Sequence, residues 1–551
     1  MKTMKRYLLT LVAMAVCGTA VAQESDFSEN MTIEKVYELE VTSAERMEVE
    51  IERLDTLPER PKLNYMIFPT PHAMEFSVKS LKPISMSTAQ WSRPAELYLN
   101  VGGGWPWQSE ADLYWTPIQN RASTLSVALN HEGSEGRVTG YDGERTTALL
   151  IRNQLGVNYS REFSPLTRFN TSVNYRGSLG SYYGGVGVAE DVEREMLSVH
   201  DVEARANLAG RFSAKSPLGY DANLMGLYAF NNLNESVWRF NVNFGLLGLD
   251  RIKGWLPSKV TLHYSGVQSV CQSPYFDTSV TFVPEWNFRI GRWIPVGIVA
   301  GYDYMVYKGA NNTLDGVITT ISVAFDRYKV AVPYLTVAND VQTQVTQLGL
   351  WNNPFMSMLP VDVRKVFLAE LGVRGEVADV TYKLSGATRW FSSYFYEVVE
   401  ERMPTLAYGC SNGQRVWYAD AEALWRPSQN FSLEGRLRYV ALGKAEEMTD
   451  EFSPRNWRAR VEAQLRPISR LMVALSGEWA SAMSVTLRQQ SGASLIEMPS
   501  YVDLGLKAEW QQSEEFYIWL RGDNLLNQPI YTYAAYKGLG AGFRAGVRIS
   551  F

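Results

Sequence analysis

The fold of this chain is decided by its last ten residues, which read Gly542-Phe543-Arg544-Ala545-Gly546-Val547-Arg548-Ile549-Ser550-Phe551. From Phe543 to Phe551 every second residue is apolar, and the residues between them are glycine, arginine or serine. Successive side chains of a β-strand point to opposite faces, so this stretch predicts a strand with one face suited to lipid and one suited to water. The pattern is typical of a strand in a transmembrane β-barrel.

The amino-terminal end predicts export. Basic residues precede an apolar run from Tyr7 to Val16, and Ala20-Val21-Ala22 has the small residues of a cleavage site. We interpret residues 1–22 as a secretory signal peptide, so that the mature chain begins at Gln23. No other segment approaches the roughly 20 continuous apolar residues of a transmembrane helix. An exported chain of alternating strands is then expected to form a closed barrel, because lipid tolerates only backbones whose hydrogen bonds are all satisfied.

Composition narrows the classes of function. Aromatic residues make up 12% of the 551 residues, with 30 Tyr and 16 Trp, which suits the interfacial girdles of a barrel. Loss of Lys2, Lys5 and Arg6 with the signal peptide takes the formal net charge from −5 to −8, which argues against nucleic acid as a partner. The four histidines show no metal-ligand spacing, and we expect no metal or cofactor.

Turn signals predict the number of strands. Working back from Phe551, alternating segments are joined by connections that are in turn short and long. Ten short ones, several with proline in a tight-turn position, run from Thr116–Arg121 to Gln511–Glu515. They separate eleven hairpins, which gives 22 antiparallel strands over residues 95–551, with 20 or 24 as open alternatives. Because outer-membrane barrels have short periplasmic turns and longer extracellular loops, both termini are expected in the periplasm.

Some details of the strand map are also expected. The long connections include Val341–Arg364 and Tyr394–Gly413, and Gly102-Gly103-Gly104 predicts a tight bend. Cys271 and Cys410 fall in separate predicted loops, so a disulfide and two separate thiols both stay open.

The faces of the strands are clearest near the carboxyl end, where apolar residues such as Val461 alternate with charged ones. A charge that faces lipid at the bilayer midplane costs about 2 to 4 kcal/mol for Arg or Lys, so we predict that the charged set faces the lumen. A lumen of mixed charge is the ordinary wet interior of such a barrel, and a substrate-selecting ladder is the alternative. The predicted lumen-facing residues are Arg436, Arg438, Arg458, Arg460, Glu462, Arg521, Arg544 and Arg548.

The carboxyl-terminal residues resemble two known patterns. A terminal strand that ends in Phe551 resembles the signal that the assembly machinery of bacterial outer-membrane proteins reads, which implies that machinery and outer-membrane lipid as partners. Residues 516–551, with Asn524-Leu525-Leu526-Asn527 followed by Tyr531, are similar to the end of a TonB-dependent receptor. That family also has a 22-strand barrel, and it often carries a Pro-Gly-Arg element where this chain has Gly538–Phe543.

The front of the chain departs from that family, whose members carry a plug domain of well over a hundred residues. Only about 70 residues separate Gln23 from the first predicted strand near Ala95, so we expect no conventional plug. Without a plug to pull on, energised import would lose its moving part. Residues 23–94 are predicted to be a short periplasmic extension, since Tyr37–Val41 alternates apolar with acidic residues; it is either a simple appendage or a docking site for a partner strand.

Two functions from different classes stay open. One is a solute transport pore, and the other is a structural or assembly subunit of an outer-membrane complex. Something must close so wide a lumen, either Val341–Arg364 with help from residues 23–92 or a lipoprotein or periplasmic partner. We expect no enzyme: a barrel enzyme such as an outer-membrane phospholipase needs a histidine and a serine together on one lipid-facing edge, and His131, in a predicted loop, has no evident partner.

Overall fold

In a computed structural model of the chain, the structure describes residues 96–120, 122–141, 143, 145–181, 183–184, 196–232, 234–270, 275–308, 312–344, 355, 362–401, 406–443, 447–448, 452–489 and 492–551. The predicted signal peptide (1–22) and periplasmic extension (23–94) lie outside these residues and stay predictions, as does the absence of a plug.

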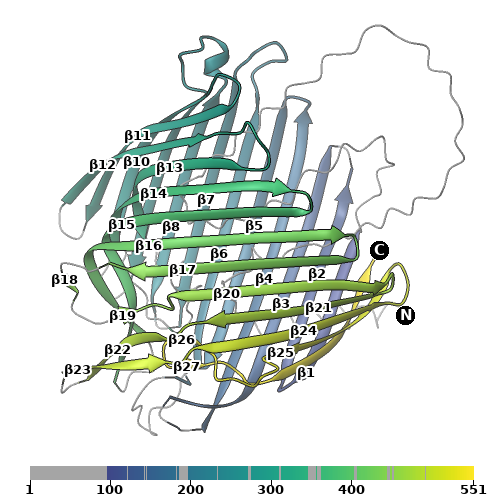
Figure 1. The fold of residues 1–551 in the computed structure, drawn as a ribbon. Coiled ribbons are helices and arrows are strands. Elements are labelled where there is room, and N and C mark those ends of the chain that lie inside the picture. The colour runs from purple at the N-terminus through teal and green to yellow at the C-terminus, as the bar shows by residue number, and fades with distance from the viewer. Residues whose placement is uncertain are drawn as a thin grey trace, which may run out of the picture.

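The described residues form one closed antiparallel barrel of 22 strands, which confirms the predicted fold class and strand number (Figure 1). These strands are β1 (Leu97–Trp105), β2 (Gln108–Gln119), β3 (Ser123–Thr139), β4 (Arg145–Ser164), β5 (Thr167–Ser181), β6 (Met196–Arg211), β7 (Gly219–Asn231), β8 (Ser236–Leu247), β9 (Lys259–Val270), β10 (Tyr275–Ile290), β11 (Ile294–Lys308), β12 (Asn312–Ala324), β13 (Val332–Gln344), β14 (Asp362–Val377), β15 (Val380–Glu400), β16 (Leu406–Ser428), β17 (Phe431–Leu442), β20 (Trp457–Ile468), β21 (Leu471–Ala480), β24 (Tyr501–Gln511), β25 (Phe516–Asp523) and β28 (Gly542–Ser550).

Smaller elements lie in the connections. A 3-10 helix, η1 (Leu249–Arg251), sits between β8 and β9. The short strands are β18 (Glu447–Met448), β19 (Phe452–Ser453), β22 (Met483–Gln489), β23 (Gly492–Met498), β26 (Tyr531–Tyr533) and β27 (Tyr536–Lys537). No helix in the described residues is long and apolar enough to cross a membrane.

The barrel closes where its first and last strands meet. β1 pairs with β28 over eight residues, from Tyr98 opposite Ser550 to Trp105 opposite Phe543. We call this pair the seam. At one end of the barrel the connections are the predicted short turns, such as Ala378-Asp379, where Ala378 takes the positive φ of 49° that a two-residue hairpin favours. We call this the short-turn end and the opposite one the long-loop end.

Several strands run further toward the long-loop end than the sequence predicts. β15 and β16 pair across most of the predicted connection Tyr394–Gly413, so the predicted bounds of that connection are wrong. Cys410 therefore lies in β16 rather than in a loop. β16 has 23 residues, about twice the 9 to 11 with which a tilted strand crosses a bilayer. Beyond the bilayer a hairpin still pairs its backbone, but its side chains no longer alternate between lipid and lumen. Cys271 is not among the described residues.

Two further predictions are wrong. Gly102-Gly103-Gly104 lies inside β1 and not at a bend. His131 lies in β3 and not in a loop, and it has partners on both sides: its Nε2 is 2.8 Å from Ser109 Oγ, and its Nδ1 is 2.6 Å from Asn153 Oδ1. Both errors come from reading short stretches without the neighbouring strands, which supply the contacts.

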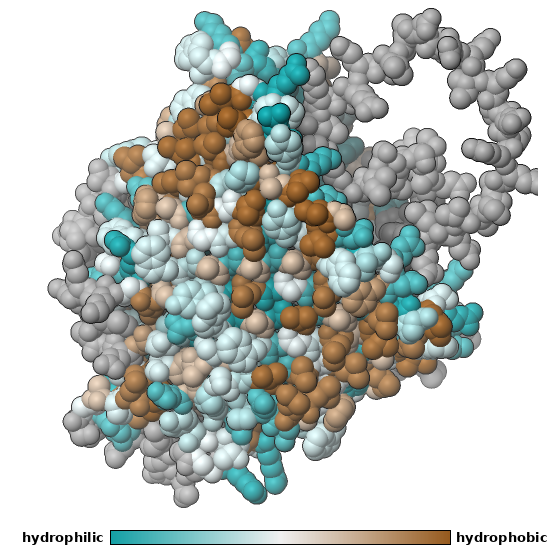
Figure 2. Space-filling view, in the orientation of Figure 1, coloured by the Kyte–Doolittle hydropathy of each residue, from teal (hydrophilic) through white to brown (hydrophobic). Residues whose placement is uncertain are grey.

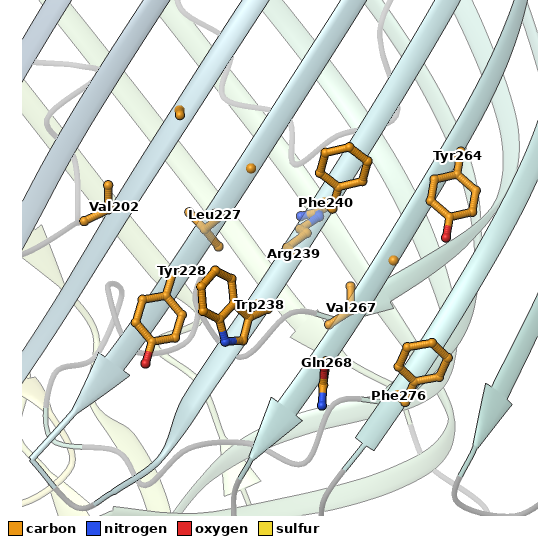
Figure 3. Close-up of a pocket in the computed structure, with 13 residues that line it drawn as sticks. Val202, Leu227, Tyr228, Trp238, Arg239, Phe240, Tyr264, Val267, Gln268 and Phe276 are labelled. Carbon is orange, nitrogen blue, oxygen red and sulfur yellow. The ribbon is translucent and has the colours of Figure 1, made fainter.

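The strands expose an apolar face. On β28, Phe543 is 56% exposed whereas the neighbouring Arg544 is buried, and Figure 2 shows apolar residues in patches over the outer surface. A depression of about 600 Å³ lies in the outer surface of β6 to β10. Gly226 and Gly266 lie on either side of Phe240 in one row across neighbouring strands, and neither has a side chain to fill the surface there. Larger rings such as Trp238 border the depression that results (Figure 3).

Candidate functional site at the long-loop end and the seam

The largest buried apolar cluster of the described residues lies at the long-loop end, and we call it the cap. Separate connections supply its centre: Phe355 lies between β13 and β14, the β22–β23 hairpin between β21 and β24, and the β26–β27 hairpin between β25 and β28. The barrel strands supply its rim. The rim residues are Leu197, Val199, Val237, Val267, Val399 and Leu406.

Stacked aromatic rings form the middle of the cap. The Phe355 ring is 2% exposed and lies 3.8 Å from the Tyr536 ring at an interplanar angle of 14°. Tyr183 meets the edge of Tyr536 at 5.2 Å, and Tyr533 meets Phe355 at 5.6 Å. Such ring pairs contribute about 0.5 to 1.5 kcal/mol each beyond their buried area. Burial raises the pKa of Tyr183, so its hydroxyl stays neutral in this apolar setting.

The cap crosses the opening of the barrel. Its rim residues come from β6, β8 and β9 on one side and from β15 and β16 on another, which are far apart in the strand order. β22 also pairs in parallel with β15 at Val399 and Glu400, although β22 belongs to the connection that follows β21. One connected cluster therefore bridges distant parts of the wall.

Two charged side chains, Arg455 and Glu397, hold the cap in place with four hydrogen bonds. Arg455 donates to the backbone carbonyls of Ser481, Pro499 and Tyr531, the last two at 3.0 Å, and thereby joins three connections. Burial lowers the pKa of Arg455 but from so high a value that the guanidinium remains charged. At the tip of the β26–β27 hairpin, the Ala534 N–H donates to Glu397 Oε2 at 3.3 Å. Sequence reasoning missed Arg455, since an arginine in a loop carries no signal of its contacts.

The predicted lumen-facing residues of β17 and β20 lie side by side. Arg436 is opposite Arg460, and Arg438 is opposite Arg458. Each repulsive pair is offset by carboxylates. The ion pairs are Arg436–Glu434 at 3.1 Å, Arg438–Asp420 at 2.6 Å and Arg458–Glu478 at 3.0 Å, and Glu462 accepts a hydrogen bond from Gln464 at 2.9 Å.

The other three predicted residues gather near the seam. The Arg544 side chain is 8% exposed and reaches Asp523 at 2.7 Å, Glu110 at 3.1 Å and Glu132 at 3.7 Å. The remaining ion pairs are Arg521–Asp523 at 2.8 Å and Arg548–Glu509 at 2.9 Å, and Arg548 also lies 4.3 Å above the Tyr517 ring. The acidic partners come from β2, β3, β24 and β25. Asp523 lies two residues from Arg521 on β25 and therefore shares its face, whereas no local pattern in the sequence links Glu110, Glu132 and Glu509 to their arginines.

Burial predicts unequal roles for the arginines. We expect Arg544→Gln to lower the free energy of unfolding by about 1 to 3 kcal/mol, because it removes a buried cation that pairs with Glu110 and with Asp523. Arg458→Gln is the matched control: the Arg458 side chain is 55% exposed, so the loss should stay below about 1 kcal/mol. Urea unfolding followed by tryptophan fluorescence measures both, and equal losses would contradict the difference in burial.

The described residues contain no group of three or more His, Cys, Asp or Glu side chains placed to hold a metal ion. The fold and the site together define a closed 22-strand β-barrel with an apolar cap across one opening and a charged, paired network at the seam.

This architecture is that of the barrel of TonB-dependent receptors, as the resemblance implied. Similar solved structures include a ferric enterobactin receptor from Pseudomonas aeruginosa, at TM-score 0.62 and 10% identity over 83% of this chain and 80% of that chain. An iron transporter from Neisseria meningitidis has TM-score 0.65 and 10% identity over 84% and 83%. A siderophore receptor from Acinetobacter baumannii has TM-score 0.62 and 8% identity over 84% and 81%. No family model and no curated protein matches the chain.

Proposed function

We propose that this chain is an outer-membrane barrel that passes a solute and is closed at its long-loop end by the cap. In this proposal the long-loop end faces the outside of the cell, and both termini lie in the periplasm, because outer-membrane barrels have short periplasmic turns. The observation that carries the proposal is the cap itself: distant connections bury an apolar cluster across one opening. A barrel that served only as an anchor would have no use for an opening sealed by side chains of its connections rather than by side chains of its wall.

The charged network supports the same proposal. We place the charged face of the strands toward the lumen, since the opposite face exposes Phe543 and Val547, and lipid excludes charge. Because Arg436, Arg438 and Arg458 each have a carboxylate partner within 3.1 Å, the wall offers paired charges rather than a field of one sign. This supports a wet interior over a substrate-selecting ladder. The similar receptors are named for iron and siderophores, so ferric siderophores are the first solutes to test.

Affinity purification from native membranes separates this function from the assembly alternative. A barrel that purifies alone and conducts solute after the cap is opened would support the pore. A stoichiometric lipoprotein or periplasmic partner, with no conductance from the opened barrel, would support a structural or assembly subunit instead.

The proposal also predicts that energised import is absent or indirect. Removing residues 23–36 from the mature chain should leave any uptake intact, because a chain whose residues 23–94 form no conventional plug, as the sequence predicts, offers TonB no domain to move. Uptake of radiolabelled ferric siderophore by cells that produce equal amounts of folded barrel measures this. If the deletion abolishes uptake while the barrel still inserts, the segment engages TonB and the prediction is wrong.

A further inference from the structure

Three side chains from neighbouring strands form a continuous hydrogen-bonded chain near the long-loop end. Ser109 Oγ of β2 lies 2.8 Å from His131 Nε2 of β3, and His131 Nδ1 lies 2.6 Å from Asn153 Oδ1 of β4. An amide oxygen only accepts hydrogen bonds, so Nδ1 carries the proton and donates to Asn153. The imidazole Nε2 is then the acceptor for the Ser109 hydroxyl. The arrangement is that of a nucleophile, a base and a group that orients the base.

The three side chains lie on the outer surface of the barrel. Each is the sequence neighbour of a residue in the inner charged network. Glu110 and Glu132 of that network contact Arg544, and Arg152 lies 3.9 Å from Glu132. Ser109 precedes Glu110, His131 precedes Glu132, and Asn153 follows Arg152. Side chains alternate between faces along a strand, so the chain of three points the other way. Polar groups on a lipid-facing surface are costly and mark functional sites by default.

Ser109 is half-buried, and a glycine lies opposite it. Gly133 stands opposite Ser109, and a Cβ at Gly133 would lie 2.6 Å from Ser109 Oγ, so only glycine leaves the hydroxyl its space. Trp107 borders the same space. Trp105 and Trp107 are 71% and 49% exposed, and tryptophan favours the boundary between lipid and water. The ester groups of bilayer lipids lie at that same boundary.

We propose that Ser109, His131 and Asn153 form a hydrolytic site for the acyl esters of membrane lipids. Ser109 Oγ attacks the ester carbonyl carbon while His131 Nε2 takes the hydroxyl proton. The bond to the alcohol breaks, His131 returns the proton to the leaving lysolipid oxygen, and the acyl group stays on Ser109. Water, deprotonated by His131 Nε2, then attacks the carbonyl carbon of the acyl-serine. The bond from that carbon to Ser109 Oγ breaks, His131 returns the proton to Ser109 Oγ, and the fatty acid leaves. Asn153 is a positioning residue that holds the imidazole in the reactive tautomer. This activity is independent of the proposed transport.

The test uses the folded barrel in vesicles of phosphatidylcholine with a fluorescent acyl chain. We expect release of the labelled fatty acid, and a loss of at least about a hundredfold in Ser109→Ala and in His131→Ala, since a positioned general base contributes about 10²- to 10⁴-fold. His200→Ala is the matched control: His200 also lies on the outer face and bonds a hydroxyl, that of Tyr175 at 2.9 Å, but belongs to no such chain, so its variant should keep full activity.

Two further measurements complete the test. A fluorophosphonate probe should label the parent protein at Ser109, mapped by peptide mass, which does not depend on any variant folding. Asn153→Leu should lose hydrolysis, whereas Asn153→Asp should restore most of it, because a carboxylate also accepts from Nδ1; a merely structural role would not follow that order. A folded parent with neither hydrolysis nor labelling, or hydrolysis that survives Ser109→Ala, would overturn the proposal.

Discussion

Replacing Phe355 and Tyr536 together with serine is expected to raise the single-channel conductance of the barrel several-fold. The two rings stack at the centre of the cap, and the removal of a buried aromatic side chain costs about 3 to 5 kcal/mol. Since each 1.4 kcal/mol is a factor of ten in an equilibrium constant, this loss shifts the balance between closed and open cap by at least about a hundredfold. Conductance in planar lipid bilayers measures the opening directly.

A control separates the cap from general damage. Phe431→Ser removes a ring that lies 5.6 Å from Trp425 at the short-turn end, so it should leave conductance unchanged. Deletion of residues 345–361, which removes Phe355 with the rest of its connection, should open the barrel as the double variant does. Unchanged conductance in both folded cap variants would mean that another element closes the lumen.

The second large effect concerns closure of the barrel at the seam. Deletion of Phe551 is expected to reduce the amount of folded barrel in the outer membrane severely and to leave precursor in the periplasm. The backbone N–H of Phe551 donates to the Leu97 carbonyl at 3.0 Å, and the Leu97 N–H donates to the Phe551 carbonyl at 2.9 Å. An unpaired edge in lipid would leave backbone groups unsatisfied at several kcal/mol each. The predicted role of Phe551 as an assembly signal leads to the same result.

Heat-modifiable migration of outer-membrane fractions on gels measures this effect. Arg548→Gln in the same strand is the control, and it should be tolerated because Lys507 remains 2.8 Å from Glu509 after Arg548 is lost. Equal folded amounts for the Phe551 deletion and the parent would refute the terminal signal. Severe loss from Arg548→Gln would show that the two faces of β28 are assigned the wrong way round.

The sequence by itself determined the features that depend on neighbouring residues. Alternation of apolar residues from Phe543 to Phe551 marked the last strand, and turn signals such as Ala378-Asp379 separated the hairpins, so the barrel and its 22 strands could be predicted. Strand periodicity and turn chemistry are local properties, and each strand pairs with the next along the chain. Local patterns did not predict the ends of β15 and β16. There the strands extend beyond the bilayer, so their side chains no longer need to alternate between apolar and polar.

Only the tertiary structure decided which distant residues meet. Phe355 stacks on Tyr536, and Ser109 reaches Asn153 through His131. At the seam the Trp519 ring lies over Gly102 and Gly546, where a Cβ would come within 2.4 Å of it. Gly102 of β1 and Gly546 of β28 therefore make room for this ring, which comes from β25. Such contacts depend on strand register and on barrel closure, which place residues together without leaving a pattern in the sequence around either one.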